Sequence, residues 1–484
     1  MVDKIDPKQL PLMDTICAIA TPAGKGGIGI VKISGLNALS LCRSVFYKKV
    51  RALPGQDVGK AVADKTFEFR PRHMYHGYIR ESATGQVVDE VLCVYMSSPH
   101  SYTGDDVVEI HSHSGPAVLE TILHMVLQRG GRCAEPGEFT QRAFLNGRID
   151  LTQAEGVIDL INAESTSAMK IAAKKVSGEL RRHIQRIRAR VLDLITLIEA
   201  GIDFPDEVGP SLGIDQKFAE IMREVLPKIE RLIRHHDQGR VFREGFRLAI
   251  VGRPNVGKSS LLNRLLGHDR AIVTDIPGTT RDLIHETVSI NGASIVLTDT
   301  AGIQATDNPI EKIGIEKTKS QIAACDLILF VVDARDGIGA DQIGWFEPAD
   351  RKKLMIVANK IDLKDNFCEY HPPERLVDLP LVCISAKTAF GVLSLFGTPL
   401  RISFFGISEA TLADTIVPNF RQKLALQNAL ADLARACHAF RENIPLEMIA
   451  IDLQGCLDAL GSILGINVRE DVLDCIFKEF CIGK

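Results

Sequence analysis

The feature that most constrains the fold is an octapeptide near the middle of the chain. Residues 252–259 read G-R-P-N-V-G-K-S and follow directly on the apolar run 246–251. Its glycines let backbone N–H groups turn toward phosphate oxygens, while Lys258 supplies a positive charge and Ser259 a hydroxyl for Mg²⁺. The octapeptide therefore predicts a strand, a phosphate-binding loop and a helix, in that order, within an α/β domain.

Three further motifs follow, each at the end of an apolar run. The first is D-T-A-G from 299, in which Asp299 can hold the water shell of Mg²⁺ and Gly302 can turn its N–H toward a γ-phosphate. The second is N-K-I-D from 359, whose Asp362 can accept hydrogen bonds from the N1–H and 2-amino groups that guanine has and adenine lacks. The third is S-A-K from 385, which can support the base. Four motifs in this order predict a GTPase domain of the Ras-like class.

The residues expected to bind GTP lie in these motifs and in the first switch. They are Asn255, Val256, Gly257, Lys258, Ser259, Ser260, Thr274, Thr279, Thr280, Asp299, Thr300, Ala301, Gly302, Asn359, Lys360, Asp362, Ser385, Ala386 and Lys387. We expect Mg²⁺ at Ser259 and Thr280. Ras-like enzymes usually carry a glutamine after the D-x-x-G glycine to orient the attacking water, and here that position is Ile303. Another polar group must therefore orient the water.

The rest of the chain predicts a multidomain protein. Residues 1–125 alternate strand-like runs with glycines and indicate an N-terminal α+β domain. Residues 126–243 and 416–484 carry apolar residues at spacings of three and four and indicate two segments of one α-helical domain. Within them we expect one long helix from Val176 to Ile198 and a helix stop at Gly465. Residues 244–415 alternate strands and helices and form the inserted Ras-like α/β P-loop domain.

The composition is typical of a folded cytoplasmic protein. Of its 484 residues, 45% are hydrophobic and 24% are charged, and no apolar run approaches the roughly 18 residues of a membrane span. The N-terminus lacks the pattern of a secretory signal. Eleven cysteines without a C-x-x-C pair favour reduced thiols over disulfides or zinc.

A net charge of −4 gives the chain no general attraction to nucleic acid, so any RNA contact must come from a local basic patch or from a partner. A basic run in the long helix could contact RNA, although such a run is more often only the solvent-exposed face of a helix. Its members are Lys170, Lys174, Lys175, Arg181 and Arg182.

Together these motifs resemble the MnmE (TrmE) family of tRNA modification GTPases across nearly the full chain. The matching stretches are G-R-P-N-V-G-K-S-S-L-L-N, T-D-I-P-G-T-T-R-D, D-T-A-G-I, N-K-I-D and S-A-K in the GTPase domain, residues 135–155, G-I-D-F-P-D-E from 201 and the closing F-C-I-G-K. The resemblance implies a potassium-stimulated GTPase that is completed when two GTPase domains pair in a homodimer. It places K⁺ at Asn255, Thr274, Ile276 and Thr279, and it assigns the orientation of the attacking water to Glu311.

The resemblance also implies a folate site in the N-terminal domain. The bound group would be 5-formyl-tetrahydrofolate or a related one-carbon tetrahydrofolate, held by Lys32, Glu109, Arg148 and Lys484. The carboxylate of Glu109 suits the N–H edge of a pterin, and cationic side chains suit its glutamyl tail. Lys32 stands where the family commonly has arginine, which replaces a bidentate donor by a point charge.

The family works with tRNA and with an MnmG (GidA) flavoprotein in a heterotetramer. Similarity to it implies that the chain adds an aminomethyl or carboxymethylaminomethyl group at C5 of the tRNA wobble uridine. Two alternatives stay open, a ribosome-assembly or regulatory GTPase without modifying chemistry, and a folate-dependent one-carbon transferase to which a GTPase domain was added for control.

The closing residues carry one further hypothesis. C-I-G-K does not fit the prenylation signal, and Cys481 lies near the cationic Lys484, a setting that favours the thiolate. The resemblance assigns Cys481 a role in the modifying reaction, as nucleophile or redox partner. His111 and His113 share one strand face, but the sequence offers no further ligands near them, so no metal site is predicted there.

Overall fold

The structure is a computed structural model that describes residues 14–49, 67–81, 84–203, 213–244, 246–268, 285–290, 293–299, 325–339, 342, 345–346, 348–363, 370–396 and 415–484. The chain divides into two compact units. One consists of Met1–Ile158, Val176–Ala189 and Leu457–Lys484, and the other of Asp159–Lys175 and Arg190–Cys456.

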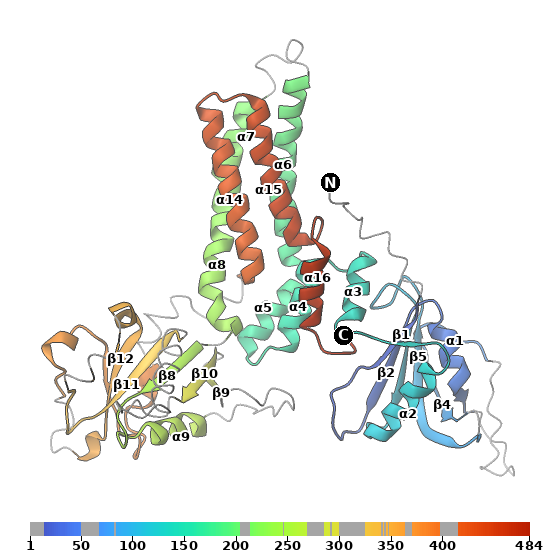
Figure 1. Cartoon of the computed structure of the whole chain (residues 1–484), viewed down its shortest axis with the longest axis horizontal. Helices are drawn as coiled ribbons and strands as arrows, with labels where there is room; N and C mark the ends of the chain where they lie inside the picture. The colour runs from blue at the N-terminus through green and yellow to red at the C-terminus, as the bar shows by residue number, and fades with distance from the viewer. Residues whose placement is uncertain are drawn as a thin grey trace, which may run out of the picture. The chain divides into compact units, whose positions relative to one another are not determined.

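The first unit is built on a mixed sheet (Figure 1). Its strands are β1 (Ile16–Ile19), β2 (Gly29–Ser34), β3 (Phe46–Lys48), β4 (Met74–Arg80), β5 (Val87–Met96), β6 (Val107–Ser112) and β7 (Arg132–Cys133), in the order β3-β4-β5-β6-β2-β1-β7. Neighbours are antiparallel except β1 and β7. Alternate residues such as Val31, Ile33, Val108 and Ile110 share a buried core with α1 (Ala38–Val45) and α2 (Pro116–Leu127). The predicted N-terminal α+β domain is confirmed.

The C-terminus belongs to this same unit. The last helix, α16 (Glu470–Lys478), contacts α3 (Glu138–Leu145). Its Phe477, together with Phe480, packs against Leu151 and Ala154 of α4 (Leu151–Ile161). Burial of these rings anchors the end of the chain beside the N-terminal sheet domain.

The second unit contains most of a helical bundle, which stands upright in Figure 1. The helices of the two helical segments are α5 (Thr166–Val176), α6 (Glu179–Asp203), α7 (Ile214–Glu220), a π-helical turn (Ile221–Val225), α8 (Leu226–Glu244), α14 (Phe420–Arg441) and α15 (Leu446–Leu464). The predicted long helix is confirmed as α6, although it begins at Glu179 rather than Val176, because Gly178 has a φ of +78° and separates α5 from α6. The predicted stop at Gly465 is confirmed by its φ of +86° directly after α15.

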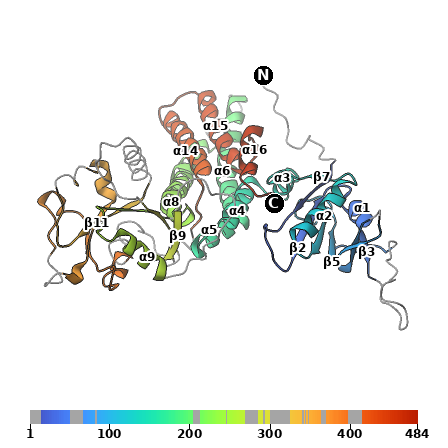
Figure 2. The same ribbon diagram turned by 60° about the horizontal axis from the view of Figure 1, so that its bottom comes forward.

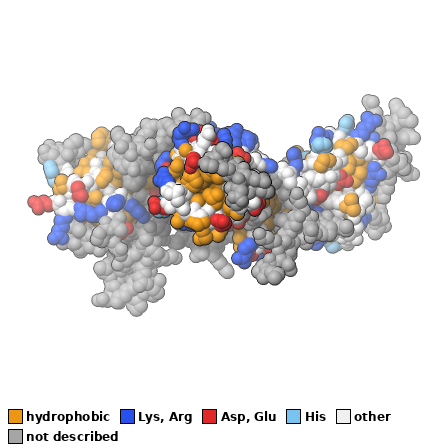
Figure 3. Space-filling model, turned by 90° about the horizontal axis from the view of Figure 1, so that it is seen from above, with side chains coloured by type: hydrophobic (Ala, Val, Ile, Leu, Met, Phe, Trp, Pro, Cys, Tyr) orange, Lys and Arg blue, Asp and Glu red, His pale blue; other side chains and the backbone are white. Residues whose placement is uncertain are grey.

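The bundle surface differs from the expected basic patch. Lys175 is only 1% exposed, and its Nζ lies 2.7 Å from Asp159 Oδ2, so the prediction that it faces solvent was wrong. Its apolar stem lies on the buried face of α5, and the ion pair compensates its charge. Figure 3 shows hydrophobic side chains gathered at the bundle end with Lys and Arg around them, and Ile444 and Met448 are exposed at the α14–α15 turn. None of the helices in the described ranges is both long and apolar enough to cross a membrane.

The inserted α/β domain also lies in the second unit and has a sheet of its own (Figure 2). Its strands are β8 (Phe246–Val251), β9 (His285–Ile290), β10 (Ala293–Asp299), β11 (Leu327–Asp333), β12 (Leu354–Asn359) and β13 (Leu381–Cys383), in the order β13-β12-β11-β8-β10-β9. All pairs are parallel except β9 with β10. Every residue of β11 and β12 is buried, as a central parallel strand requires. The carboxyl ends of the parallel strands therefore bring the sequence motifs to one edge.

The two ends of the inserted domain meet at α8. This helix packs against α14, and Lys423 forms an ion pair with Asp237. The His236 ring Nδ1 lies 2.8 Å from the carbonyl oxygen of Pro418, on the segment that returns from the inserted α/β domain. A Cβ at Gly239 would overlap Val417, so glycine permits this close approach. The entry and exit of the insertion are therefore neighbours.

Candidate nucleotide-binding and N-terminal sites

The phosphate-binding loop joins β8 to α9 (Lys258–His268) and relies on two glycines. A Cβ at Gly252 would overlap the carbonyl oxygen of Val331, and a Cβ at Gly257 would overlap Asn359 Nδ2. Gly257 also has a φ of +99°, in the left-handed region that glycine adopts without steric cost. Only glycine at these positions lets the backbone lie this close to the neighbouring strands.

Lys258 and Ser259 stand at the start of α9. Lys258 Nζ donates to the carbonyl oxygens of Gly252 at 2.8 Å and Arg253 at 2.9 Å, which holds the cation over the loop. The backbone N–H groups of a helix N-terminus and this charge together favour a phosphate group. Ser259 is exposed in the first helical turn, and Asp299 ends β10 in register with Ile250 of β8. The hydroxyl of Ser259 is an oxygen ligand of the kind that suits Mg²⁺.

Asn359 ties the base-binding motifs to the phosphate-binding loop. Its Nδ2 donates to the carbonyl oxygen of Val256 at 2.8 Å, and its Oδ1 accepts from the backbone N–H of Ala386 at 2.9 Å. Lys360, with a φ of +64°, donates from Nζ to the carbonyl oxygen of Asn255 at 2.6 Å. The structure thus brings N-K-I-D, S-A-K and the phosphate-binding loop together, as predicted.

Asp333, which the sequence analysis missed, orients Lys360. It ends β11 beside Asn359 in β12, and its Oδ2 lies 2.9 Å from Lys360 Nζ. The hydrogen bond from Arg335 holds the pKa of this carboxyl well below its ordinary value, although burial opposes the shift. Asp333 therefore stays ionised and fixes the lysine. An aspartate at the end of a wholly apolar strand was the available signal.

Asp362 carries the group that can read the base. Its Oδ1 is buried and lacks a hydrogen-bond partner within the described part of the chain. A buried carboxylate oxygen without a partner costs free energy, so this atom is suited to accept an N–H from a ligand. The N1–H and 2-amino groups of guanine are such donors, and adenine lacks both. The expected residues Thr274, Ile276, Thr279, Thr280, Thr300, Ala301, Gly302 and Glu311 lie outside the described residues.

In the N-terminal unit, Lys32 and Glu109 face each other across β2 and β6. Lys32 is 9% exposed, and its Nζ lies 5.3 Å from the ring centre of Tyr102 and 5.2 Å from that of Phe139. Burial lowers the pKa of Lys32, the charge of Glu109 opposes this shift, and the charge of Lys484 adds to it. The two aromatic rings stabilise the largely buried cation. Neither ring was among the predicted site residues.

The C-terminal segment, residues 481–484, lies at the same sheet. A Cβ at Gly483 would come within 2.6 Å of the carbonyl oxygen of Ile19 at the end of β1, and Gly483 has a φ of +94°. Cys481 is exposed. Arg148 is exposed as well, and its Nε donates to the carbonyl oxygen of Ser101 at 3.1 Å. The structure therefore groups Lys32, Glu109 and Lys484, while Arg148 contacts the loop that carries Tyr102.

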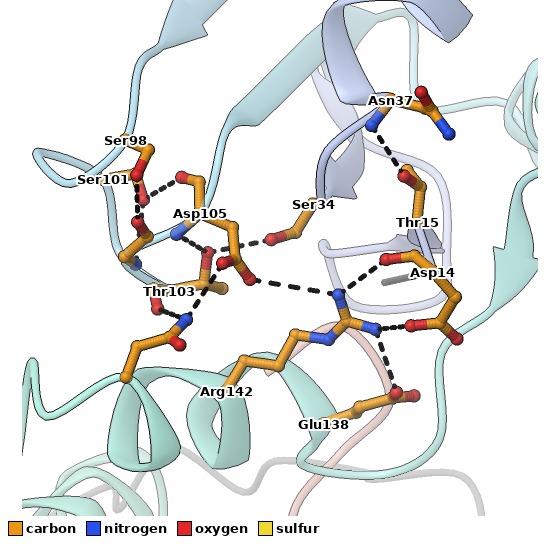
Figure 4. A network of polar contacts seen from close by, with 12 residues as sticks. Asp14, Thr15, Ser34, Asn37, Ser98, Ser101, Thr103, Asp105, Glu138 and Arg142 are labelled. Carbon is orange, nitrogen blue, oxygen red and sulfur yellow. Dashed lines mark hydrogen bonds and ion pairs between the residues drawn. The ribbon is translucent and has the colours of Figure 1, made fainter. Parts of the chain in front are cut away.

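Arg142 holds that loop in place (Figure 4). It is wholly buried, its Nη1 donates to the carbonyl oxygen of Asp14 at 3.0 Å, and its Nη2 forms an ion pair with the Asp14 carboxylate. Glu138 and Asp105 lie 3.5 Å and 3.9 Å from its guanidinium. The network ties β1, α3 and the loop before β6 together. Glu138 and Arg142 at a spacing of four suggest a helical ion pair, but nothing in the sequence indicates its burial.

His111 and His113 each lie beside an acidic side chain. His111 Nε2 lies 3.2 Å from Glu109 Oε2, and His113 Nδ1 lies 2.7 Å from Asp89 Oδ1. Among the residues that the structure describes, no group of three or more His, Cys, Asp or Glu side chains is arranged to hold a metal ion.

The parallel sheet, the glycine-dependent loop and the carboxylate for the base define a P-loop GTPase of the Ras-like class. A family model for the MnmE helical domain matches residues 151–481, and one for the GTP-binding protein TrmE N-terminus matches residues 15–148. The chain belongs to the MnmE family of tRNA modification GTPases, and the predicted family is thereby confirmed.

Individual relatives match over nearly their whole length. The tRNA modification GTPase MnmE of Moorella thermoacetica is 41% identical over 480 residues, which cover 98% of this chain and 100% of the relative. That of Symbiobacterium thermophilum is 42% identical over 472 residues, 97% of this chain and 99% of the relative. Among solved structures, Era from Aquifex aeolicus is 28% identical over 38% of this chain and 66% of its own, with a TM-score of 0.26.

Proposed function

We propose that this protein acts with an MnmG-type flavoprotein to build the aminomethyl or carboxymethylaminomethyl group at C5 of the tRNA wobble uridine. Its membership in a family of tRNA modification GTPases supports the GTPase activity and the role in tRNA modification. The observation that carries the finer proposal is the arrangement in the N-terminal unit. There the C-terminal segment with Cys481 and Lys484 lies at the sheet that holds Lys32 and Glu109.

A one-carbon tetrahydrofolate, such as the 5-formyl form, is the proposed ligand of this N-terminal site, and it would supply the carbon. Glu109 would accept N–H groups of a pterin ring. Lys32 and Lys484 would provide positive charge for the glutamyl tail, and the rings of Tyr102 and Phe139 would stabilise the ammonium group of Lys32. Arg148 is proposed to contact the same ligand from the rim. The chain's own contribution is to bind and orient the donor beside the exposed thiol of Cys481.

GTP hydrolysis is proposed to act as a conformational switch rather than to supply the carbon. Two GTPase domains of a homodimer would pair, and K⁺ at Asn255, Thr274, Ile276 and Thr279 would neutralise charge that develops on the phosphates. Glu311 would orient the attacking water in place of the glutamine that Ile303 replaces.

The modification proposal predicts that Cys481→Ala abolishes wobble-uridine modification while GTP turnover by the purified protein stays at the wild-type level. The physical reason is that the thiol lies in the N-terminal unit, whereas nucleotide binds in the other unit. The measurement is mass spectrometry of tRNA from cells that carry only the variant chain. Cys475→Ala is the matched control, because Cys475 is also an exposed thiol and lies six residues earlier on α16.

Normal wobble uridine in cells that lack the protein would contradict the proposal. It would favour the alternative of a ribosome-assembly or regulatory GTPase without modifying chemistry. Loss of modification in Cys475→Ala to the same extent as in Cys481→Ala would remove the specific role of Cys481.

The hydrolysis proposal predicts that turnover falls severalfold when Na⁺ replaces K⁺, and that Glu311→Ala binds GTP normally but loses most turnover. A monovalent cation of the right size and a carboxylate for water would both be needed in the transition state. Phosphate release under single-turnover conditions, with light scattering to follow dimer formation, measures both effects. Equal turnover in the two salts by a protein that stays monomeric is the contrary result.

A further inference from the structure

One arginine that belongs to none of the GTPase motifs holds the loop after β13. Arg264 lies on α9, six residues after Lys258. Its Nε donates to the carbonyl oxygen of Ala386 at 3.3 Å, and its Nη2 donates to that of Lys387 at 2.7 Å. A guanidinium presents its donors as a rigid fork, so it can fix two neighbouring acceptors at once. Within the described residues, no carboxylate pairs with Arg264, so these two carbonyl groups are what its side chain binds.

The arginine determines where the backbone N–H of Lys387 points. A trans peptide is planar, and its N–H points away from the C=O of the preceding residue. Because Arg264 draws the Ala386 carbonyl to one side, the Lys387 N–H faces the other. The adjoining N–H groups are already used, that of Ala386 by Asn359 Oδ1 at 2.9 Å and that of Thr388 by Ser385 Oγ at 3.1 Å. Among residues 386–388 of the described structure, Lys387 is therefore the residue whose backbone N–H has no hydrogen-bond partner.

Arg264 and Asn359 hold opposite sides of the same loop. Asn359 binds an N–H of the loop and the carbonyl oxygen of Val256, so it links the loop to the phosphate-binding loop. Arg264 binds the carbonyl side and links the loop to the helix that begins with Lys258. Two fixed attachments leave the peptide between Ala386 and Lys387 little freedom to rotate. A donor that is oriented before the ligand arrives costs less entropy to order on binding.

We infer that Arg264 is a positioning residue for guanine recognition, because it aims the Lys387 N–H at O6 of the base. This inference rests on the proposed guanine site at Asp362. O6 is an acceptor where adenine carries an amino donor, so a fixed N–H at this point favours guanine. The two recognition groups are then complementary, with Asp362 accepting from N1–H and Lys387 donating to O6.

The test compares GDP with 6-thio-GDP, in which a weakly accepting sulfur replaces O6. Dissociation constants are measured by calorimetric titration on the full-length protein. We expect Arg264→Ala to weaken GDP binding about five- to tenfold, the contribution of one or two neutral hydrogen bonds. We expect 6-thio-GDP binding to change less than about twofold, because that ligand has little of this bond to lose. Arg264→Lys, which can still donate to one carbonyl group, should recover part of the loss.

Arg247→Ala is the control, since Arg247 is an exposed arginine on β8 of the same domain, and both affinities should stay at the wild-type values. Equal weakening of GDP and 6-thio-GDP by Arg264→Ala would overturn the inference, because a purely structural role affects both ligands alike. Unchanged GDP binding would overturn it too. If Arg264→Ala does not fold, the weakening of GDP binding relative to that of 6-thio-GDP binding is measured for Arg264→Lys, and this comparison decides whether the inference holds. A wild-type protein that does not prefer GDP to ADP would instead refute the guanine site itself.

Discussion

We expect Asp362→Asn to weaken GDP binding by about 100-fold or more and to make xanthosine diphosphate (XDP) the preferred ligand. Each hydrogen bond to a charged group contributes about 1.5–3 kcal/mol, and guanine offers two donors to this carboxylate. Asparagine keeps one acceptor for N1–H but presents an amide N–H where the 2-amino group of guanine donates. Xanthine carries a carbonyl oxygen at that position and can accept from the amide. The substitution should have a large effect on nucleotide preference because Oδ1 of Asp362 is buried and has no hydrogen-bond partner in the described part of the chain.

Competition of GDP and XDP against a fluorescent nucleotide measures this reversal. Asp378→Asn is the control, because Asp378 lies in the same domain but is 70% exposed and pairs only with Arg351 among the described residues. Its replacement should leave both affinities within about twofold of wild type, as expected for an exposed ion pair. If Asp362→Asn still preferred GDP to XDP, Asp362 would not be the group that reads the base.

We expect Arg142→Ala to destabilise the N-terminal unit by about 3–5 kcal/mol, because removing one partner of a buried ion pair leaves carboxylates without compensation. Asp14 and Glu138 would lose the cation that pairs with them. Burial raises the pKa of Asp105, and the charge of Arg142 opposes this shift, so without Arg142 the Asp105 carboxyl would take up a proton more readily. For a unit of this size, the loss corresponds to a fall of roughly 10 °C in the unfolding midpoint. Scanning calorimetry, with hydrogen exchange in β1 and α3, measures it.

Arg435→Ala provides the matched control. Arg435 also lies near two carboxylates, Asp432 and Asp452, but its side chain is 59% exposed, whereas that of Arg142 is wholly buried. Exposed ion pairs contribute about 0–1 kcal/mol, so this variant should unfold almost as the wild type does. Equal effects of the two replacements would show that burial is not what makes the Arg142 network important.

Acid should diminish the effect of Arg142→Ala. Burial raises the pKa of Asp14, but Arg132 and Arg142 outweigh it, and the carboxyl titrates below its ordinary value of 3.8. A depressed carboxyl pKa contributes stability above the unfolded value, and this contribution is lost as the pH falls through the folded value. The difference in free energy of unfolding between wild type and variant should therefore have its full size near pH 7 and become smaller below about pH 4.

Sequence reasoning succeeded where the chemistry is local. A strand must precede the glycine-rich loop, apolar runs must alternate with helices, and Gly465 can end a helix in a conformation that other residues avoid. It placed the start of the long helix three residues too early, because apolar spacing continues from Val176 across Gly178, whose backbone conformation separates α5 from α6. Spacing identifies the face of a helix but does not show whether the chain turns between two helices.

The long-range contacts of the sites were not predictable in this way. Arg142 meets Asp14, which lies 128 residues away in the sequence, and Lys32 meets the rings of Tyr102 and Phe139 only because the sheet and α3 bring them together. Arg264 meets Ala386 across 122 residues. A sequence pattern records which residue types occur at one point, and these partners are set by the tertiary fold. Motifs therefore located the nucleotide site, but they did not reveal the residues that position it.

The adjacency of α8 and residues 415–418 has a consequence for building smaller proteins. The His236 ring contacts the carbonyl oxygen of Pro418, and Lys423 pairs with Asp237, so the bundle keeps its own contacts at the point where the GTPase domain departs. Closing a short gap between two neighbouring chain ends costs little entropy. Excising residues 246–414 and joining the ends with a few glycines should leave α8 and α14 paired as a continuous helical hairpin. The GTPase domain can then be removed without unfolding the helical bundle, and a different domain can be inserted at the same junction.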